Sequence, residues 1–208
     1  MLPEPEGPRQ GIAGTGEPLR LLITGDSSAA GVGAETQEVA LSGQLAARLA
    51  PHVQVNWQLH ATTGHRTRDT IARLQALNRQ KFDIALIALG VNDVTRANTQ
   101  ARFLAQQAQL WELLQARFGV RQILCCGVPP MAHFPLLPQP LAWVLGQHAL
   151  RLDTGLAALA SQSAGVSHLP LVLPRTRQMA ATDGFHPSTK AYAIWAENLA
   201  KHILTEHL

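Results

Sequence analysis

The sequence predicts an α/β protein in which helices cover both faces of a parallel β-sheet. Three observations support this fold class: short apolar runs recur along the chain, amphipathic helical patterns separate them, and no internal repeat is present. Parallel neighbours in a sheet need a long crossover, usually a helix, so strands that alternate with helices are typical of this architecture. The 208 residues are enough for one domain with a sizeable core.

Five segments have the pattern of strands. Three are apolar runs without alternation, which is typical of strands buried on both faces, and each is followed by a glycine. Another alternates apolar with polar residues, which suits a more peripheral position in the sheet, and the last pattern is short. In chain order, the predicted strands cover residues 19–24, 53–59, 84–89, 123–126 and 166–169.

Helical patterns fill the intervals between these strands. The predicted helices cover about 40–49, 68–77, 99–118 and 141–163, and a last helix follows its capping residue Ser188. The longest helix has Phe103, Trp111 and Phe118 on one face, as a helix packed on a sheet requires. Gly119 follows it in the position of a C-terminal capping glycine.

Composition limits the class of protein. Hydrophobic residues make up 46% of the chain and charged residues 15%, which indicates a folded globular protein. The formal net charge is +3, but lysine and arginine form no run, so the sequence argues against a nucleic-acid partner. No stretch approaches the ~18 consecutive apolar residues of a transmembrane helix. Adjacent Cys125 and Cys126 point to opposite sides of a strand, so we expect two core residues and no disulfide.

The first eighteen residues contain four prolines and four glycines. This composition excludes a helix or an inner strand and predicts a flexible leader over 1–18, followed by a single domain over 19–208. The expected compartment is cytoplasmic for a full chain, and periplasmic or secreted if a signal peptide or anchor was removed upstream. The sequence makes no prediction of the oligomeric state.

Asp183 and His186 are the most informative pair for function. Their spacing lets the carboxylate fold back in one turn onto the imidazole Nδ1–H, which leaves the other ring nitrogen as a general base. Ser27 follows a predicted buried strand and is the nucleophile that such a base needs. Ligand sites of open parallel sheets lie outside the carboxyl ends of the strands, where Ser27 is expected. The sequence therefore predicts a catalytic triad.

Acyl transfer also needs donors for the oxyanion of the tetrahedral intermediate. The candidates are the N–H groups of Ser27 and Gly64 and the side-chain amide of Asn92, all of which follow predicted strands. Gly64 has no side chain to obstruct a close approach. Asp26 and Asp93 are interpreted as acceptors that brace the site loops or as helix caps. Neither His-Glu-x-x-His nor Cys-x-x-Cys spacing occurs, so the sequence predicts no metal site.

Four short segments together resemble the block pattern of the SGNH hydrolases, also called the GDSL esterase/lipase family. They are Gly25-Asp26-Ser27-Ser28, Thr63-Gly64-His65, Gly90-Val91-Asn92-Asp93 and Asp183-Gly184-Phe185-His186-Pro187. The resemblance covers the chain from about Leu19 to the last helix. It departs from the family pattern at Ser28, where the family name has leucine, and at Thr63, where asparagine often precedes the glycine.

This resemblance implies a fold, an activity and a set of site residues. The implied fold is a three-layer αβα sandwich of flavodoxin-like type with a five-stranded parallel sheet, and the implied activity is ester hydrolysis without a cofactor. Ser27, Gly64, Asn92 and His186 match the four residues that name the family, and Asp183 completes the triad. Ser27, Gly64 and Asn92 then form the oxyanion hole. The absence of Gly-x-Ser-x-Gly disfavours the ordinary α/β-hydrolase family.

The segment 128–140 contains five prolines, which keep it out of helix and sheet, and it is strongly apolar for a loop. One hypothesis is that Met131, Phe134 and Leu137, together with Trp143, form the wall of an acyl pocket. The alternative is that the segment packs on the core between sheet and helix.

The function predicted from these residues is a serine hydrolase that cleaves small-molecule carboxylic esters, with short to medium acyl chains, through an acyl-enzyme. The same machinery also suits O-deacetylation of a carbohydrate or cell-surface polymer, and thioesterase or lysophospholipase activity. Outside the enzymes, the alternative is a catalytically silent scaffold that binds a ligand at the edge of the sheet.

Overall fold

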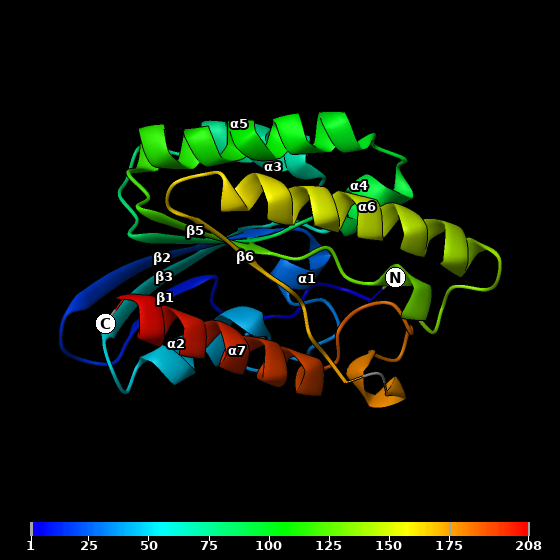
Figure 1. The fold of residues 1–208 in the computed structure, drawn as a ribbon. Coiled ribbons are helices and arrows are strands. Elements are labelled where there is room, and N and C mark those ends of the chain that lie inside the picture. The colour runs from blue at the N-terminus through cyan, green and yellow to red at the C-terminus, as the bar shows by residue number, and fades with distance from the viewer. Residues whose placement is uncertain (1, 175, 208) are drawn as a thin grey trace.

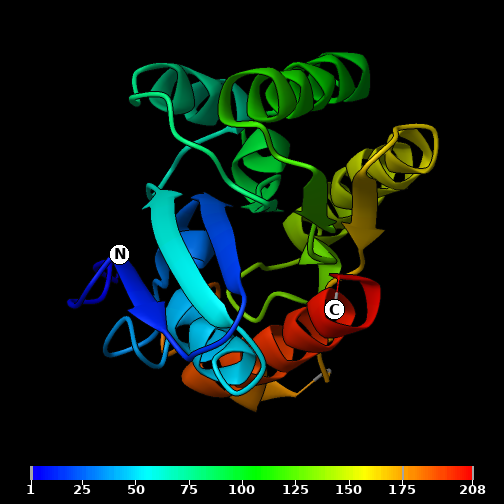
Figure 2. The same cartoon turned by 90° about the vertical axis from the view of Figure 1, so that its left-hand side faces the viewer.

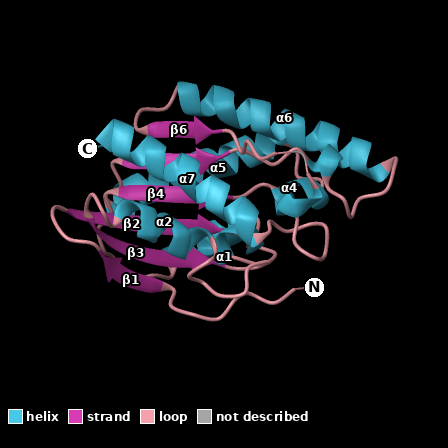
Figure 3. Cartoon of the chain, turned by 90° about the horizontal axis from the view of Figure 1, so that it is seen from below, coloured by secondary structure: helices cyan, strands magenta, loops and turns pink. Residues whose placement is uncertain are grey.

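The computed structural model describes residues 2–174 and 176–207, and its centre is a six-stranded sheet with the order β1-β3-β2-β4-β5-β6 (Figure 3). Five of these strands are parallel, and β1 runs antiparallel to β3. The strands are β1 (Gln10–Ala13), β2 (Pro18–Gly25), β3 (Gln54–Ala61), β4 (Ile84–Ala88), β5 (Gln122–Cys126) and β6 (Val166–Leu169). The predicted α/β class with a mostly parallel sheet is confirmed.

Helices cover both faces of this sheet, which makes three layers (Figures 1 and 2). Helices α2 and α7 lie on one face, and α3, α5 and α6 lie on the other. The helices are α1 (Ser27–Ala30), α2 (Leu41–Leu49), α3 (Thr67–Gln75), α4 (Val91–Thr95), α5 (Gln100–Phe118), α6 (Leu141–Ser161) and α7 (Thr189–His207), with 3₁₀ turns at Met131–His133 and Arg177–Met179. The short helices α1 and α4 directly follow β2 and β4.

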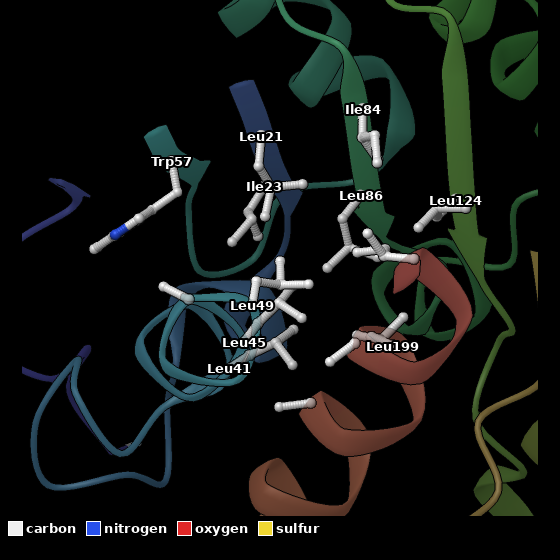
Figure 4. Packing of buried hydrophobic residues seen from close by; sticks show 14 of the residues in the cluster. Leu21, Ile23, Leu41, Leu45, Leu49, Trp57, Ile84, Leu86, Leu124 and Leu199 are labelled. Carbon is white, nitrogen blue, oxygen red and sulfur yellow. The ribbon is translucent and has the colours of Figure 1, made fainter. Parts of the chain in front are cut away.

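The core consists of two clusters, one on each face of the sheet. Successive side chains of a strand point to opposite faces, so neighbouring residues of β2 enter different clusters. Leu21 and Ile23 pack with Leu45 and Leu49 of α2 (Figure 4). Leu22 faces the other way, into the cluster that α3, α5 and α6 complete. The sheet is therefore covered by apolar side chains on both faces, as the uninterrupted apolar runs predict.

Strand β1 is the difference from the five-strand prediction, and it comes from the segment expected to be a flexible leader. Residues 10–13 pair with β3 from Gln10↔Gln58 to Ala13↔Val55, and the N–H of Leu59 donates to the carbonyl of Arg9 at 2.7 Å. Prolines and glycines exclude an inner strand, but an edge strand needs a partner on one side only. The pairing is with a segment about 45 residues away, so no local pattern indicates it.

The helix boundaries agree with the sequence patterns to within a few residues. Thr99 caps α5 by accepting the N–H of Arg102, and Gly119 ends that helix with a φ of 64°, a left-handed conformation that favours glycine. Within the described ranges, none of the helices combines the length and the apolar character needed to span a bilayer.

Candidate active site

Ser27 lies where β2 turns into α1, at the carboxyl edge of the sheet. Gly25 ends β2 with a φ of 155°, and a Cβ at this position would meet the carbonyl oxygen of Ala88 at 2.1 Å, so only glycine fits. Asp26 then caps α1 by accepting the N–H of Ser28. Ser27 is the first residue of α1 and is 8% exposed. The tight turn thus directs the serine to the edge where ligand sites of parallel sheets occur.

The structure brings Ser27, His186 and Asp183 into one hydrogen-bonded chain. His186 Nε2 lies 3.0 Å from the Oγ of Ser27, and His186 Nδ1 lies 2.6 Å from the Oδ2 of Asp183. The imidazole is 7% exposed, so both of its nitrogens are held by protein groups. A carboxylate on Nδ1 makes that nitrogen a donor, and Nε2 is then free to accept the serine proton.

A local turn builds the Asp183–His186 pair. The Oδ1 of Asp183 accepts the N–H groups of Phe185 and His186, each at 3.0 Å, and Gly184 has a φ of 67° between them. Burial would raise the pKa of Asp183, but the hydrogen bonds from the His186 ring and from these N–H groups lower the pKa below its ordinary value. The carboxyl is therefore ionised at neutral pH and can stabilise an imidazolium.

Gly64 lies on the loop after β3, and Asn92 lies at the start of α4, after β4. The N–H of Thr62 donates to the carbonyl of Gly25 at 3.2 Å, which places the loop after β3 beside the turn that carries Ser27. Gly64 has a φ of 83°, and nothing lies within 4 Å of the position that its Cβ would occupy. Among the bonds between described residues, none uses the N–H of Ser27 or of Gly64. Both N–H groups can therefore donate to a ligand.

Asn92 is in α4, directly after β4, and its amide points toward the same turn. Its Nδ2 donates to the carbonyl of His65 at 3.1 Å and lies 3.5 Å from the Oδ2 of Asp26. The next residue, Asp93, is fully buried and accepts the N–H and the hydroxyl of Thr67 at 3.1 and 2.9 Å. The contact between Asp93 and Thr67 joins α4 to the start of α3. Asp93 is therefore a brace between the site loops, which is one of the two roles expected of it.

Asp26 is the most unusual titratable group of the site. It is 1% exposed, and burial raises its pKa to about 6, against the opposing effect of hydrogen bonds from the N–H and hydroxyl of Ser28. The carboxyl lies beside Ser27 in the chain and beside Asn92 in space. Its charge therefore changes close to neutral pH, next to the candidate nucleophile.

A cavity of about 840 Å³ opens beside Ser27 and His186. Its walls are mostly apolar and come from the ends of β4 and β5, from within 129–135, from within 171–174 and 176–180, and from Trp195 of α7. Phe134 lines the cavity and packs edge-on against Phe185, with 5.1 Å between the two ring centroids. Phe185 in turn packs against the His186 ring. The candidate catalytic serine thus opens onto a mostly apolar space, with His133, Thr176 and Arg177 among its polar lining residues.

Three of the four pocket residues expected from the sequence are not among the residues lining this cavity. Met131 is fully buried in the core cluster under α5 and α6, because the 3₁₀ turn points it inward. Leu137 is half-buried and packs on the edge of the same cluster. Trp143 is 61% exposed on α6. For Met131 and Leu137, the alternative of packing on the core holds; only Phe134 lies in the expected place.

The second wall of the cavity was missed by the sequence analysis. It includes Leu171, Val172, Leu173 and Met179, which follow β6. Residues 170–174 read Pro-Leu-Val-Leu-Pro, the same combination of prolines and apolar residues that marked 128–140. This signal was available, and the position after the last strand puts it at the same edge of the sheet.

Among residues 2–174 and 176–207, no group of three or more histidine, cysteine or acidic side chains is arranged to hold a metal ion. Cys125 and Cys126 are both free and buried in β5. The groups that meet at this edge of the sheet are a serine, a histidine and a carboxylate, with free N–H donors beside them.

Comparison with known proteins identifies the family. The sequence profile of the GDSL-like Lipase/Acylhydrolase family matches residues 23–194, a range that includes every segment of the site. The chain therefore belongs to the GDSL-like lipase/acylhydrolase family, the SGNH hydrolases. The GDSL-like esterase Rv1075c of Mycobacterium tuberculosis is similar to it, with 28% identity over 204 residues. The match covers 91% of this chain and 64% of the relative, so the chain spans less than two thirds of that protein.

Solved structures share the fold. One is a carbohydrate esterase family 2 enzyme with a carbohydrate binding domain from Corynascus thermopiles (Myceliophthora fergusii), with a TM-score of 0.71, 16% identity, and coverage of 93% of this chain and 67% of that chain. Another is the psychrotrophic esterase EstA from Pseudoalteromonas sp., with a TM-score of 0.67, 18% identity, and coverage of 89% and 97%. At these identities, the likeness shows the common fold.

Proposed function

We propose that this protein is a serine carboxylic-ester hydrolase in which Ser27 is the nucleophile, His186 the general base and Asp183 the residue that orients it. One observation carries the proposal: an unbroken chain of contacts, 3.0 Å from Ser27 Oγ to His186 Nε2 and 2.6 Å from His186 Nδ1 to Asp183 Oδ2. Membership of an acylhydrolase family supports it. These distances are within the range needed for proton transfer.

The mechanism follows from these contacts. Ser27 Oγ attacks the ester carbonyl while His186 Nε2 takes its proton, and Asp183 stabilises the imidazolium. His186 then gives the proton to the leaving alcohol, and an acyl-enzyme remains on Ser27. Water, deprotonated by His186, attacks this acyl group; the bond from the acyl carbon to Ser27 Oγ then breaks, His186 returns the proton to Oγ, and the acid is released.

The oxyanion of each tetrahedral intermediate needs donors, and three are at hand. The N–H groups of Ser27 and Gly64 make no bond among described residues, and the Asn92 amide, at the start of α4, would exchange a present contact with the His65 carbonyl or Asp26 for the oxyanion. Loss of one such donor typically costs about 3–4 kcal/mol of transition-state stabilisation. Loss of the Gly64 N–H from its place should therefore lower the rate even with the triad intact.

The substrates that we propose are esters of short- to medium-chain acids. The cavity beside Ser27 is walled mainly by apolar side chains such as Phe134, Leu173 and Met179, which suit an acyl chain and outnumber the polar ones. This observation favours acyl esters over acetylated polymers, although both reactions use the same triad. Thioesters and lysophospholipids carry acyl chains that fit the same walls.

The test is hydrolysis of p-nitrophenyl esters from acetyl to palmitoyl. We expect Ser27→Ala to lose about a thousandfold or more in kcat, as loss of a triad member does. Ser28→Ala is the matched control, because its hydroxyl contacts Asp26 and not His186, and we expect a loss of less than about tenfold. A fluorophosphonate should label wild type and Ser28→Ala but not Ser27→Ala. Equal losses in both variants, or a correctly folded wild type that is silent on every ester, would sink the proposal.

A further inference from the structure

The segment before β2 reaches the active-site edge of the sheet. Strand β1 anchors it to β3, and the N–H of Gln37 donates to the carbonyl of Glu6 at 2.8 Å. Glu4, before the first anchor, and Arg9, between the two, lie beside the loop that follows β3. This is the loop that carries Gly64, one of the proposed oxyanion donors.

Glu4 holds the residue directly before Gly64. Its Oε1 accepts the N–H of Thr63 at 2.8 Å and the Thr63 hydroxyl at 2.7 Å, while its Oε2 pairs with Arg9 at 2.8 Å. Arg9 also donates to the carbonyl of Ala61. The carboxylate of Glu4 thus holds Thr63, and the guanidinium of Arg9 holds Ala61.

The loop has few other restraints near Gly64. Among described residues, the other bonds of its backbone groups are from Thr62 N–H to the Gly25 carbonyl and from His65 N–H to the Thr62 carbonyl, each at 3.2 Å, and from Asn92 Nδ2 to the His65 carbonyl at 3.1 Å. Gly64 itself is exposed, has a φ of 83°, and has no side chain to pack. A glycine loses much conformational freedom on folding, so its N–H direction depends on what holds its neighbours. The peptide on its N-terminal side belongs to Thr63, the residue that Glu4 holds.

We propose that Glu4 and Arg9 are positioning residues for the reaction, which hold the Gly64 N–H at the place where the oxyanion forms. The inference rests on the proposed function. An oxyanion donor acts only at 2.7–3.1 Å from the developing charge, and small misplacements have large effects on rate. Hydrogen bonds to a carboxylate are the shorter and stronger class, so they suit this role.

The charge state of Glu4 is compatible with this role. Burial would raise its pKa, but the hydrogen bonds from Thr63 and the charge of Arg9 lower the pKa below the ordinary value of a glutamate. The carboxylate is therefore available as an acceptor at neutral pH.

The test compares Glu4→Gln with Glu6→Gln in the full chain. Glu6 is exposed two residues away, and its carboxylate makes no hydrogen bond among described residues, so it is a matched control. With p-nitrophenyl acetate, we expect Glu4→Gln to lower kcat about tenfold with KM within about twofold, and Glu6→Gln to behave as wild type. Phosphonylation of Ser27 by a fluorophosphonate should slow by a similar factor. Amide hydrogen exchange should become faster in residues 61–65 in Glu4→Gln only.

Variants of Thr63 separate positioning from stability. Thr63→Ser keeps the hydroxyl and N–H that Glu4 accepts, so kcat should stay within about twofold of wild type, whereas Thr63→Val should lower it.

A kcat for Glu4→Gln within twofold of that for Glu6→Gln, or a raised KM with kcat unchanged, overturns the inference. Ser27→Ala is run alongside: if it is as active as wild type, the proposed function fails, whereas an inactive Ser27→Ala with an unaffected Glu4→Gln removes only this inference.

Discussion

At the scale of single residues, burial sets the chemistry of this site. His186 is buried with both nitrogens in contact with protein groups, and the carboxylate of Asp183 is held in the ionised form by hydrogen bonds. The pKa of Asp26 is shifted upward instead, because desolvation raises it by more than the two hydrogen bonds from Ser28 lower it. Two aspartates within one site thus have pKa values shifted in opposite directions, which is typical of sites that use protonation states.

The raised pKa of Asp26 gives a stability effect with a definite sign. In the folded state this carboxyl titrates near 6, while in the unfolded chain it titrates near 4, so the folded state binds the proton more tightly. The stability that this proton contributes is present below about pH 4 and is lost as the pH rises to about 6. We expect Asp26→Asn to gain stability relative to wild type over this interval, by about 2–3 kcal/mol.

The measurement is urea denaturation of wild type and Asp26→Asn between pH 4 and pH 7. Asp83→Asn is the control, because its interaction with Arg20 lowers the Asp83 pKa to about 2. Asp83 is ionised in both states above about pH 5, so its difference from wild type should be constant there. A constant difference for Asp26→Asn from pH 4 to pH 7 would contradict the burial argument.

At the scale of elements, each parallel strand delivers a loop to the same edge. The loop after β2 carries Ser27, the loop after β3 carries Gly64, and α4 after β4 carries Asn92. The loops after β5 and β6 contribute the two apolar walls of the cavity. The segment between β6 and α7 also carries Asp183 and His186, so it contributes to both the candidate triad and a wall, whereas the loop after β5 contributes wall residues and no member of the candidate triad.

Truncation of the walls should change the preference for acyl length. We expect Leu173→Ala to lower kcat/KM for octanoyl and decanoyl esters by about tenfold or more and to leave acetyl esters within about twofold. Phe134→Ala should act in the same direction, with an added loss because Phe134 supports Phe185 beside His186.

The controls for this experiment are Leu137→Ala and Trp143→Ala, since neither side chain lines the cavity. Their profiles over p-nitrophenyl esters from acetyl to palmitoyl should have the same shape as that of wild type. A uniform decrease for Leu173→Ala at every chain length would show that the residue supports the site and does not contact the acyl chain.

At the scale of the whole molecule, one sheet separates two apolar clusters and joins them. Leu21 and Leu22 are consecutive, both fully buried, and belong to opposite clusters. Since β2, β4 and β5 each contribute side chains to both clusters, neither cluster can be exposed without breaking the sheet. We therefore propose that residues 19–208 unfold as a single domain.

This proposal is tested by substitution on each face. We expect Leu21→Ala and Leu22→Ala to lower the free energy of unfolding by about 2–5 kcal/mol each, as buried leucine truncations do. Trp57 and Trp195 are in one cluster and Trp111 in the other, so tryptophan fluorescence and circular dichroism should report one coincident transition in both variants. Two separate transitions in either variant would contradict it.

Local patterns in the sequence determined much of this protein. The apolar runs and helical faces fixed the order of strands and helices, because burial periodicity is a property of neighbouring residues. The Asp183–His186 pair is a turn of four residues, so its geometry is also local. Ser27, Gly64 and Asn92 were found because parallel strands end at one edge, and each of them follows a strand.

Only the tertiary structure decided the features that depend on distant pairs. The pairing of β1 with β3, the contact of Glu4 with Thr63 and the hold of Asp93 on Thr67 join residues far apart in the chain. The direction in which Met131 and Trp143 point was decided in the same way, by which side of a loop or helix the core covers. Sequence periodicity carries no record of these contacts, because each exists only when folding brings the two segments together.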